Sequence, residues 1–367
     1  MNSRCRRRVP LIPEELQDSH IELCSILLLA KFQFTVQNIF ILFLSTSSLH
    51  VAAYATFSRM NFLGETEAVD MKPIITFGSI YWLNTIVDFV LGRQGDVLFL
   101  TNLLPDSSQA GLYDVAYSIA QLASLAMTVG LSGVTFATFA RLAVSDTEAM
   151  DKFYAFSIRI ISLLTIPLYA FLAFNAGSVL SVLYSNKYAG AVSLVQGILL
   201  FRTASRLFGG GENGEYLLSH GRVGTLVTLG VISATTNFLL NVLLIPKLGA
   251  MGAVIASGCG NILVNLLGAF AVYKVSVNRM QVLFWGKLTG ACFLASFICL
   301  NLVPTTSFLS LIVAGLLYAL VIGSLLLLIK PLTAADYRWL SQIDARLADV
   351  LQRFTQVEFR PAQRSSR

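Results

Sequence analysis

The sequence predicts an all-α fold, a polytopic membrane bundle of about nine transmembrane helices. Hydrophobic residues make up 55% of the 367-residue chain and charged residues only 13%, whereas a soluble globular protein has about 25% charged residues. The mean hydropathy is +0.71. Uncharged runs along the chain are long enough to cross a bilayer, and the alternating ten-residue pattern of porin-type barrels is missing.

The order of the helices follows from the uncharged runs and from the charges and prolines that separate them. The first helix is expected within Ile21 to Ser58, followed by charged residues from Arg59 to Lys72. Later ones are expected at Pro73 to Leu104, Asp114 to Arg141, Ile160 to Asn186, Lys187 to Phe208, on both sides of the hairpin at 246–249 as far as Lys274, and on both sides of Pro304 within Leu288 to Ile329. A charged loop is expected from Arg141 to Arg159.

The hairpin between the sixth and seventh helices lies within Asn237 to Ser257. The outgoing helix is expected to end at Ile245, because Pro246 cannot continue the helical hydrogen bonding. Gly249 and Gly252 then allow the returning helix to start close against its neighbour.

The distribution of basic residues favours one orientation in the membrane. If the polar tail after Ile329 is cytoplasmic, the loops on that side hold nearly all the basic residues between helices, and the opposite loops hold only Lys187 and Lys247. The exception is the N-terminal arginine cluster, which an odd number of helices places outside.

Several functions are excluded by composition and motif. The five cysteines form no CxxC pair and the three histidines are isolated, so no metal site is expected. Neither a Walker A sequence nor a Ser-His-Asp or Cys-His set is present, so we expect neither an enzyme nor a cofactor. The basic residues sit at the ends of apolar runs, as membrane topology requires, so nucleic acid is not an expected partner.

The strongest candidates for a functional site are three charged residues inside the second predicted helix, Asp88, Arg93 and Asp96. An ionised group at that depth costs at least about 2.5–3.5 kcal/mol, so such residues face a cavity or one another. Arg93 and Asp96 are three residues apart and able to pair on one helix face. The alternative is an internal salt bridge that stabilises a helix break at Gly92 and Gly95.

Two further pairs are candidates. Arg202 and Arg206 share one helix face, where they would either bind anionic headgroups or extend to the membrane surface. Asn237 and Asn241 lie one turn apart and would either contact sugar hydroxyls or bond neighbouring helices. The glycine-rich loop at 209–214 is expected to be a plain hinge or linker.

Two tyrosines of the third predicted helix are expected to have no functional role. Tyr113 and Tyr117 are expected at the outer membrane interface, as part of an aromatic belt.

In the tail, Thr333 is expected to cap a helix with Asp336 at its third position. That helix is amphipathic, so it would either lie in the membrane interface or dock on a cytoplasmic loop.

Three stretches together resemble a known family. The hairpin fits LNxxLIPxxGxxGAxIA, Gly95 to Leu122 contains an aspartate helix followed by G-x-Y-x-x-A, and Leu180 to Leu200 has a Lys-Tyr turn between helices. With the tail KPLTAADYRWL, these motifs resemble the polysaccharide biosynthesis (oligosaccharide flippase) branch of the multidrug/oligosaccharidyl-lipid/polysaccharide exporter superfamily. The resemblance covers most of Ile74 to Leu351.

The resemblance implies a division of the chain, because members of that family have two six-helix lobes related as internal repeats. Here one lobe would be complete, preceded by the last helix of an N-terminally incomplete first lobe. The expected parts are a basic N-terminus (1–20), the last helix of the first lobe with its loop (21–72), the second lobe (73–274), two additional helices (275–330) and a cytoplasmic amphipathic tail (331–367).

The resemblance also implies a function: a flippase that moves an isoprenyl-pyrophosphate-linked oligosaccharide across a bacterial inner membrane for exopolysaccharide, capsule or O-antigen assembly. Arg93 would contact the pyrophosphate, with Arg202, Arg206, Asn237 and Asn241 as further substrate contacts, and Asp88 or Asp96 would couple a proton or sodium ion. Membrane lipids, a polysaccharide polymerase and export machinery are the other implied partners.

Three alternatives remain open at this point. One is a cation-coupled multidrug exporter of the same superfamily, whose cavity needs acidic residues. Another is a remnant or scaffold that does not transport. A membrane glycosyltransferase or polymerase would need a larger loop or catalytic domain than the sequence offers.

Overall fold

The computed structural model describes residues 92–128, 131–273, 282–303, 305, 307–333, 336–337 and 339–340, together with scattered residues between 41 and 85. The chain divides into two compact units, Met1–Thr76 and Phe77–Arg367. In the first unit only isolated helical residues are described, such as Ile41 and Val51. Asp88 lies outside the described residues, as does most of the first predicted helix.

The second unit is built of helices, and every regular element in the described residues is helical. In chain order these are α4 (Arg93–Leu103), α5 (Ser108–Thr128), α6 (Leu131–Ser145), α7 (Thr147–Phe174), α8 (Ala176–Tyr184), the 3₁₀ helix η1 (Ser185–Ala191), α9 (Val192–Arg206), α10 (Glu212–Ser219), α11 (Val223–Leu248), α12 (Ala250–Tyr273), α13 (Val282–Leu302) and α14 (Phe308–Ile329). This confirms the predicted all-α membrane bundle.

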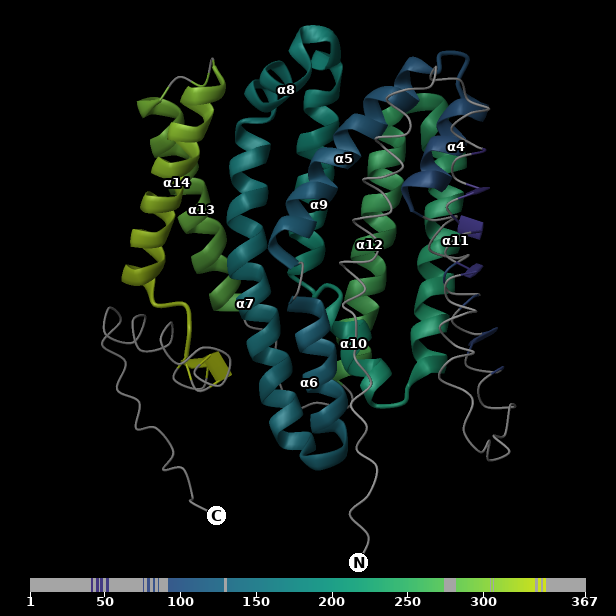
Figure 1. The fold of residues 1–367 in the computed structure, drawn as a ribbon, viewed down its shortest axis with the longest axis vertical. Coiled ribbons are helices and arrows are strands. Elements are labelled where there is room, and N and C mark those ends of the chain that lie inside the picture. The colour runs from purple at the N-terminus through teal and green to yellow at the C-terminus, as the bar shows by residue number, and fades with distance from the viewer. Residues whose placement is uncertain are drawn as a thin grey trace, which may run out of the picture. The chain divides into compact units, whose positions relative to one another are not determined.

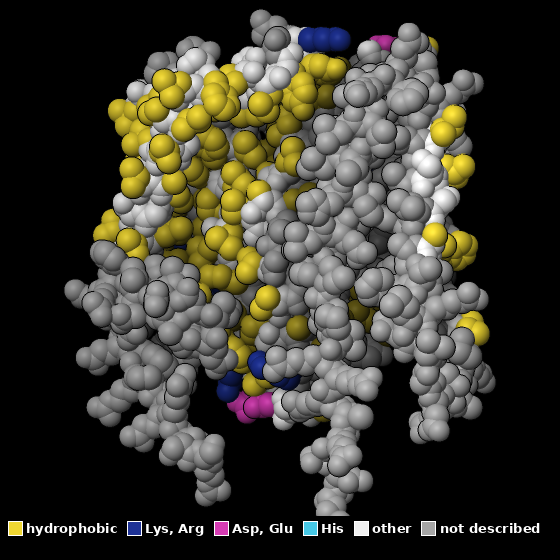
Figure 2. Space-filling view, viewed as in Figure 1, with side chains coloured by type: hydrophobic (Ala, Val, Ile, Leu, Met, Phe, Trp, Pro, Cys, Tyr) yellow, Lys and Arg dark blue, Asp and Glu magenta, His cyan; other side chains and the backbone are white. Residues whose placement is uncertain are grey.

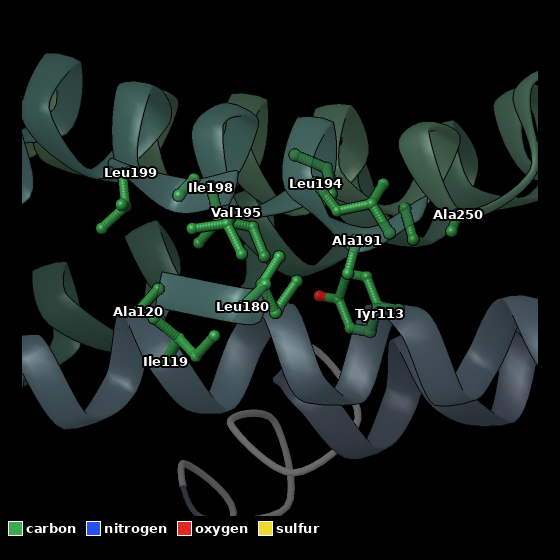
Figure 3. Close-up of a cluster of buried hydrophobic side chains, with 14 of the residues drawn as sticks. Tyr113, Ile119, Ala120, Leu180, Ala191, Leu194, Val195, Ile198, Leu199 and Ala250 are labelled. Atoms are coloured by element: carbon green, nitrogen blue, oxygen red, sulfur yellow. The ribbon is translucent and has the colours of Figure 1, made fainter. Parts of the chain in front are cut away.

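The long helices of this unit lie side by side (Figure 1), with α13 and α14 at one side, α4 and α11 at the other, and α7, α9 and α12 between them. Buried apolar residues form three clusters, and α7 contributes to each of them, for example through Phe153, Ile166 and Tyr169. The largest cluster joins α5 to α9, whose side chains interdigitate in Figure 3.

Two sequence predictions about the middle of the chain are corrected. The third predicted helix is two helices, α5 and α6, bent by 53° with respect to each other. The stretch from Arg141 to Arg159 is not a loop, because α6 continues to Ser145 and α7 begins at Thr147. Asp146 between them accepts a hydrogen bond from the Ala149 N–H (2.9 Å) and caps α7.

The predicted hairpin between α11 and α12 is present, with a shifted turn. Pro246 does not end the helix: it lies in the last turn of α11, which continues to Leu248. Gly249 then turns the chain with φ = 58°, a conformation that favours glycine. At Gly252 a Cβ atom would lie 2.6 Å from the Leu244 carbonyl, so the two helices meet there backbone to backbone.

The surface is that of a membrane protein. In the view of Figure 2 the described side chains along the middle of the unit are mostly hydrophobic, and the visible charged ones lie at its two ends. Five helices are long and apolar enough to cross a membrane, or six if the bent pair α5–α6 is one span, counting the described residues alone. The α13–α14 pair confirms the expectation of two helices on either side of Pro304.

The close contact at Gly252 generates a prediction. Gly252→Ala forces the α11–α12 backbones apart, and overpacking of this kind costs about 1–3 kcal/mol. The thermal unfolding midpoint of the purified protein in detergent should therefore fall. Gly224→Ala is the control, because a Cβ there meets nothing within 4 Å. Equal midpoints for the two variants would contradict the close packing.

Candidate functional site

A buried carboxylate joins three helices. The side chain of Asp96, on α4, is 1% exposed. Its Oδ2 accepts a hydrogen bond from the Tyr113 hydroxyl of α5 (2.5 Å), and its Oδ1 accepts one from the Asn241 amide of α11 (2.8 Å). Asn241 also donates to Asn237 Oδ1. The asparagine pair therefore makes the bond between helices that was one of its two expected roles.

The sequence around Asp96 explains its position. Gly92 has an extended backbone and lies at the N-terminus of α4, and Gly95 lies inside this helix, so the chain does not break at Gly95. Asp96 falls in the first turn of α4, where the helix macrodipole favours a negative charge. None of the ion pairs among the described residues includes Asp96, so neutral groups satisfy its oxygens.

Arg93 does not form the expected pair with Asp96. Its Nε lies 2.5 Å from Oδ1 of Asp114 on α5, and the two side chains are 37% and 42% exposed. Arg93 thus contacts α5, while Asp96 is buried in the core. An ion pair this exposed contributes little stability, so its main effect is to neutralise Arg93.

A polar pocket of about 230 Å³ lies between α5, α7, α9 and α12. Its lining contains arginines, phenols, amides and glycines but no acidic residue. The lining residues are Tyr117, Tyr169, Ile198, Phe201, Arg202, Ser205, Arg206, Gly210, Gly211, Val254, Ser257, Gly258, Asn261 and Asn265. Of the predicted site residues, only Arg202 and Arg206 line this pocket.

Arg202 is held in the pocket wall by neutral groups of α5. Its guanidinium donates to the Ala120 carbonyl (2.8 Å), the Ser124 hydroxyl and Gln121 Oε1 (3.0 Å). The same group lies 5.1 Å from the ring centre of Tyr117, in a cation–π contact. No ion pair among the described residues includes Arg202. Its positive charge is therefore uncompensated.

Arg206 differs, because it is neutralised inside the protein. It donates to both carboxylate oxygens of Glu212 (2.8 and 2.7 Å), and Glu212 is 3% exposed. The loop between them is not a plain linker: a Cβ at Gly210 would lie 2.6 Å from Arg206 Nη1. We call residues 206–214 the elbow. Asn213 closes it by donating to the Phe208 carbonyl (2.7 Å) and to the Asn265 carbonyl (3.1 Å).

Sequence reasoning missed the α5 residues that complete the buried Asp96 cluster and the polar pocket. Tyr113 is fully buried inside the bundle and is therefore not part of a lipid-facing aromatic belt, and Tyr117 stacks on Arg202. A usable signal was present: Tyr113, Tyr117, Gln121 and Ser124 recur every three or four residues, which places them on one polar face of an otherwise apolar helix.

Among the described residues, no three His, Cys, Asp or Glu side chains are grouped where they would hold a metal ion.

Apolar helices packed around a buried carboxylate and a polar pocket define a multi-pass membrane protein. Residues 12–193 match the sequence profile of a family described as polysaccharide biosynthesis protein. The match includes Asp96 and the α5 residues, and it confirms the resemblance to polysaccharide biosynthesis proteins. Searches of curated proteins and of solved structures gave no match.

The buried carboxylate cluster predicts a difference between two tyrosines. Tyr113→Phe leaves Asp96 Oδ2 without its donor, and an unsatisfied buried group of this kind costs about 1–3 kcal/mol. The unfolding midpoint of Tyr113→Phe should fall. Tyr117→Phe is the matched control, because no hydrogen bond of its hydroxyl is found among the described residues and the ring that stacks on Arg202 is kept. An equal loss in both variants would contradict the role of Tyr113.

Proposed function

We propose that this protein is a flippase that translocates a lipid-linked oligosaccharide across a bacterial inner membrane during exopolysaccharide, capsule or O-antigen assembly. The observation that carries the proposal is the uncompensated charge of Arg202 in a polar pocket inside a membrane bundle. A buried or half-buried charge without a counter-ion is unfavourable, so such a site favours an anionic ligand. The family match supports a polysaccharide-related substrate.

The pocket chemistry supports a phosphorylated sugar. Arginine donates several hydrogen bonds in a plane and binds phosphate oxygens well. The amides of Asn261 and Asn265 and the hydroxyl of Ser257 supply the donors and acceptors that sugar hydroxyls need. We assign the contact with the carrier pyrophosphate to Arg202 instead of Arg93, because Asp114 neutralises Arg93 and Arg93 does not line the pocket.

In this proposal Asp96 couples an ion gradient to translocation. A carboxylate that only neutral donors satisfy is able to exchange its charge for a proton or to attract a sodium ion, and its bonds to Tyr113 and Asn241 link it to two other helices. A change of charge at Asp96 would therefore alter the contacts between α4, α5 and α11. Asp88 keeps its expected coupling role as a proposal on residues outside the described part.

The remaining parts of the proposal follow from topology and family. The C-terminus is cytoplasmic, as the basic residues of the loops favour. Membrane lipids surround the bundle, and a polysaccharide polymerase and export machinery use the product. A cation-exporting protein is less well supported, because the pocket lining lacks an acidic residue that would attract a cationic drug.

The charge of Arg202 is tested by an isosteric change beside it. Gln121→Glu places a carboxylate at the Arg202 guanidinium without altering side-chain size. Neutralising Arg202 should remove a charge-assisted hydrogen bond to the ligand, worth about 1.5–3 kcal/mol, and so lower the affinity for the lipid-linked sugar by about 10- to 100-fold. Affinity is measured on purified protein, and surface polysaccharide is measured in cells that carry each variant in place of the wild-type gene.

Two controls separate charge from folding. Arg202→Gln should lose affinity as Gln121→Glu does, whereas Lys152→Gln removes an exposed positive charge and should leave both measurements unchanged. Unchanged affinity in Gln121→Glu would overturn the anion site. Normal polysaccharide export in cells that lack the whole protein would overturn the flippase function itself.

Ion coupling is tested at Asp96. In proteoliposomes, Asp96→Asn should abolish the stimulation of lipid-linked sugar translocation by an imposed proton or sodium gradient, while the affinity for the substrate is retained. Asp106→Asn is the control: Asp106 is an exposed aspartate in the turn before α5, where hydrogen bonds from the Ser108 hydroxyl (2.6 Å) and N–H (2.9 Å) lower its pKa. Gradient stimulation that persists in Asp96→Asn would contradict the coupling role.

A further inference from the structure

A second buried ion pair lies outside the polar pocket and joins the tail to α7. Asp336, seven residues after the end of α14, pairs with Arg159 in the first half of α7. The two side chains are 1% and 8% exposed, so this pair is far more buried than the Arg93–Asp114 pair. The start of the tail therefore docks on the helix α7, not on a loop, and the rest of the expected amphipathic helix lies outside the described residues.

The carboxylate of Asp336 also builds the turn that starts the tail. Its Oδ2 accepts hydrogen bonds from the Thr333 N–H and from the Thr333 hydroxyl, both at 2.7 Å, while its Oδ1 accepts from Arg159. The predicted cap between Thr333 and Asp336 is thus present, and the capping group is also the group that binds α7.

Apolar contacts complete the docking. The Trp339 ring meets Phe153 of α7 edge to face, with ring centres 5.1 Å apart. Tyr337 is buried, and Leu340 joins a buried cluster made by α6, α7 and α10. A solvated tail lying on the surface would bury neither a carboxylate nor these rings.

Release of the tail would leave the guanidinium of Arg159 without its carboxylate partner, Asp336. Arg159 has one hydrogen-bonded partner for its guanidinium among the described residues, Asp336, and its Nε already lacks a partner. An unpaired guanidinium in this position is strongly unfavourable. Release of the tail therefore leaves the Arg159 guanidinium either unpaired or exposed to water, so the docked tail contributes to fixing this stretch of α7.

The same stretch of α7 holds the wall of the polar pocket. The Tyr154 hydroxyl donates to Asn213 Oδ1 (2.5 Å) in the elbow, and the Tyr216 hydroxyl of α10 donates to Asp151 Oδ1 (2.5 Å). Gly210 and Gly211 of the elbow line the pocket. A continuous set of packed side chains and hydrogen bonds, of the kind that carries energetic coupling, thus runs from the tail through α7 to the pocket.

We propose that the docked tail residues Thr333, Asp336, Tyr337, Trp339 and Leu340 form a latch that holds this end of the polar pocket closed. With the latch docked, α7 fixes the elbow. With it released, α7 shifts, the elbow loses the hydrogen bond from Tyr154 to Asn213, α10 loses its hydrogen bond from Tyr216 to Asp151, and the pocket becomes more accessible. The inference deepens the proposed function by adding regulation of the pocket, and it rests on that function only for its effect on transport.

The test measures docking and pocket access on the purified full chain, without transport. Tail docking is followed by the rate of tryptic cleavage at Arg338. Pocket access is followed by the alkylation rate of Ser257→Cys in a background without native cysteines. Asp336→Asn should raise both rates by about tenfold or more, because it removes the charge that holds the latch. Glu148→Gln is the matched control, since it breaks an exposed pair with Lys152 on the same helix, and should change neither rate.

Two further variants keep the test decisive if Asp336→Asn folds poorly. Arg159→Gln with Asp336→Asn removes both charges, so no buried charge is stranded, and Trp339→Ala removes the apolar contact and leaves the ion pair. Both should raise the two rates. Faster cleavage with unchanged alkylation would overturn the latch, because the tail would then dock without controlling the pocket. Unchanged rates in all variants would overturn the docking as well. Neither outcome bears on substrate affinity, which tests the proposed flippase function separately.

Discussion

The arrangement of this protein depends on the cost of placing charge among apolar helices. Each strongly buried charge that the structure describes has a partner on another segment or turn, and these bonds fix how the helices meet. Asp96 fastens α4 to α5 and α11 through neutral donors, and the Arg206–Glu212 pair closes the elbow. Of the two arginines in the pocket lining, Arg206 pairs with Glu212, whereas Arg202 bonds neutral acceptors alone. The charge of Arg206 is therefore structural, and the charge of Arg202 is available to a ligand.

The helix α7 connects these features. It packs against the core of α5 and α9, against the buried cluster that contains Phe139 of α6 and Tyr216 of α10, and against the pair α13–α14. Its Tyr154 touches the elbow and its Arg159 touches the tail. The helix α7 therefore contacts the elbow beside the pocket, the tail and the pair α13–α14. Because the interior is closely packed, a displacement of α7 would change the contacts of all three.

The sequence predicted the helical class and the main turns well, because runs of apolar residues and their interruptions are local signals. The hairpin was predicted from Pro246 and Gly249, although Pro246 remains inside α11 and the turn lies at Gly249, and the helix pair around Pro304 followed from that proline. The α6–α7 region was misjudged, since its charges lie on helices at the end of the bundle and not in a loop. The partner of Arg93 was also missed: spacing along one helix favoured Asp96, whereas the bond formed runs to a different helix.

The buried bonds also bear on how the chain is made. Asp96 and Asn241 are 145 residues apart, and Arg159 and Asp336 are 177 apart. During synthesis, each early charge leaves the ribosome long before its partner exists. Insertion of α4 or α7 into hydrocarbon before the partner exists costs about 2.5–3.5 kcal/mol for an ionised group near the bilayer centre, which favours contact with water until the partner is made. These two bonds are thus completed only when α11 and the tail are made. A chain interrupted before Asp336 would leave the Arg159 guanidinium without its carboxylate partner.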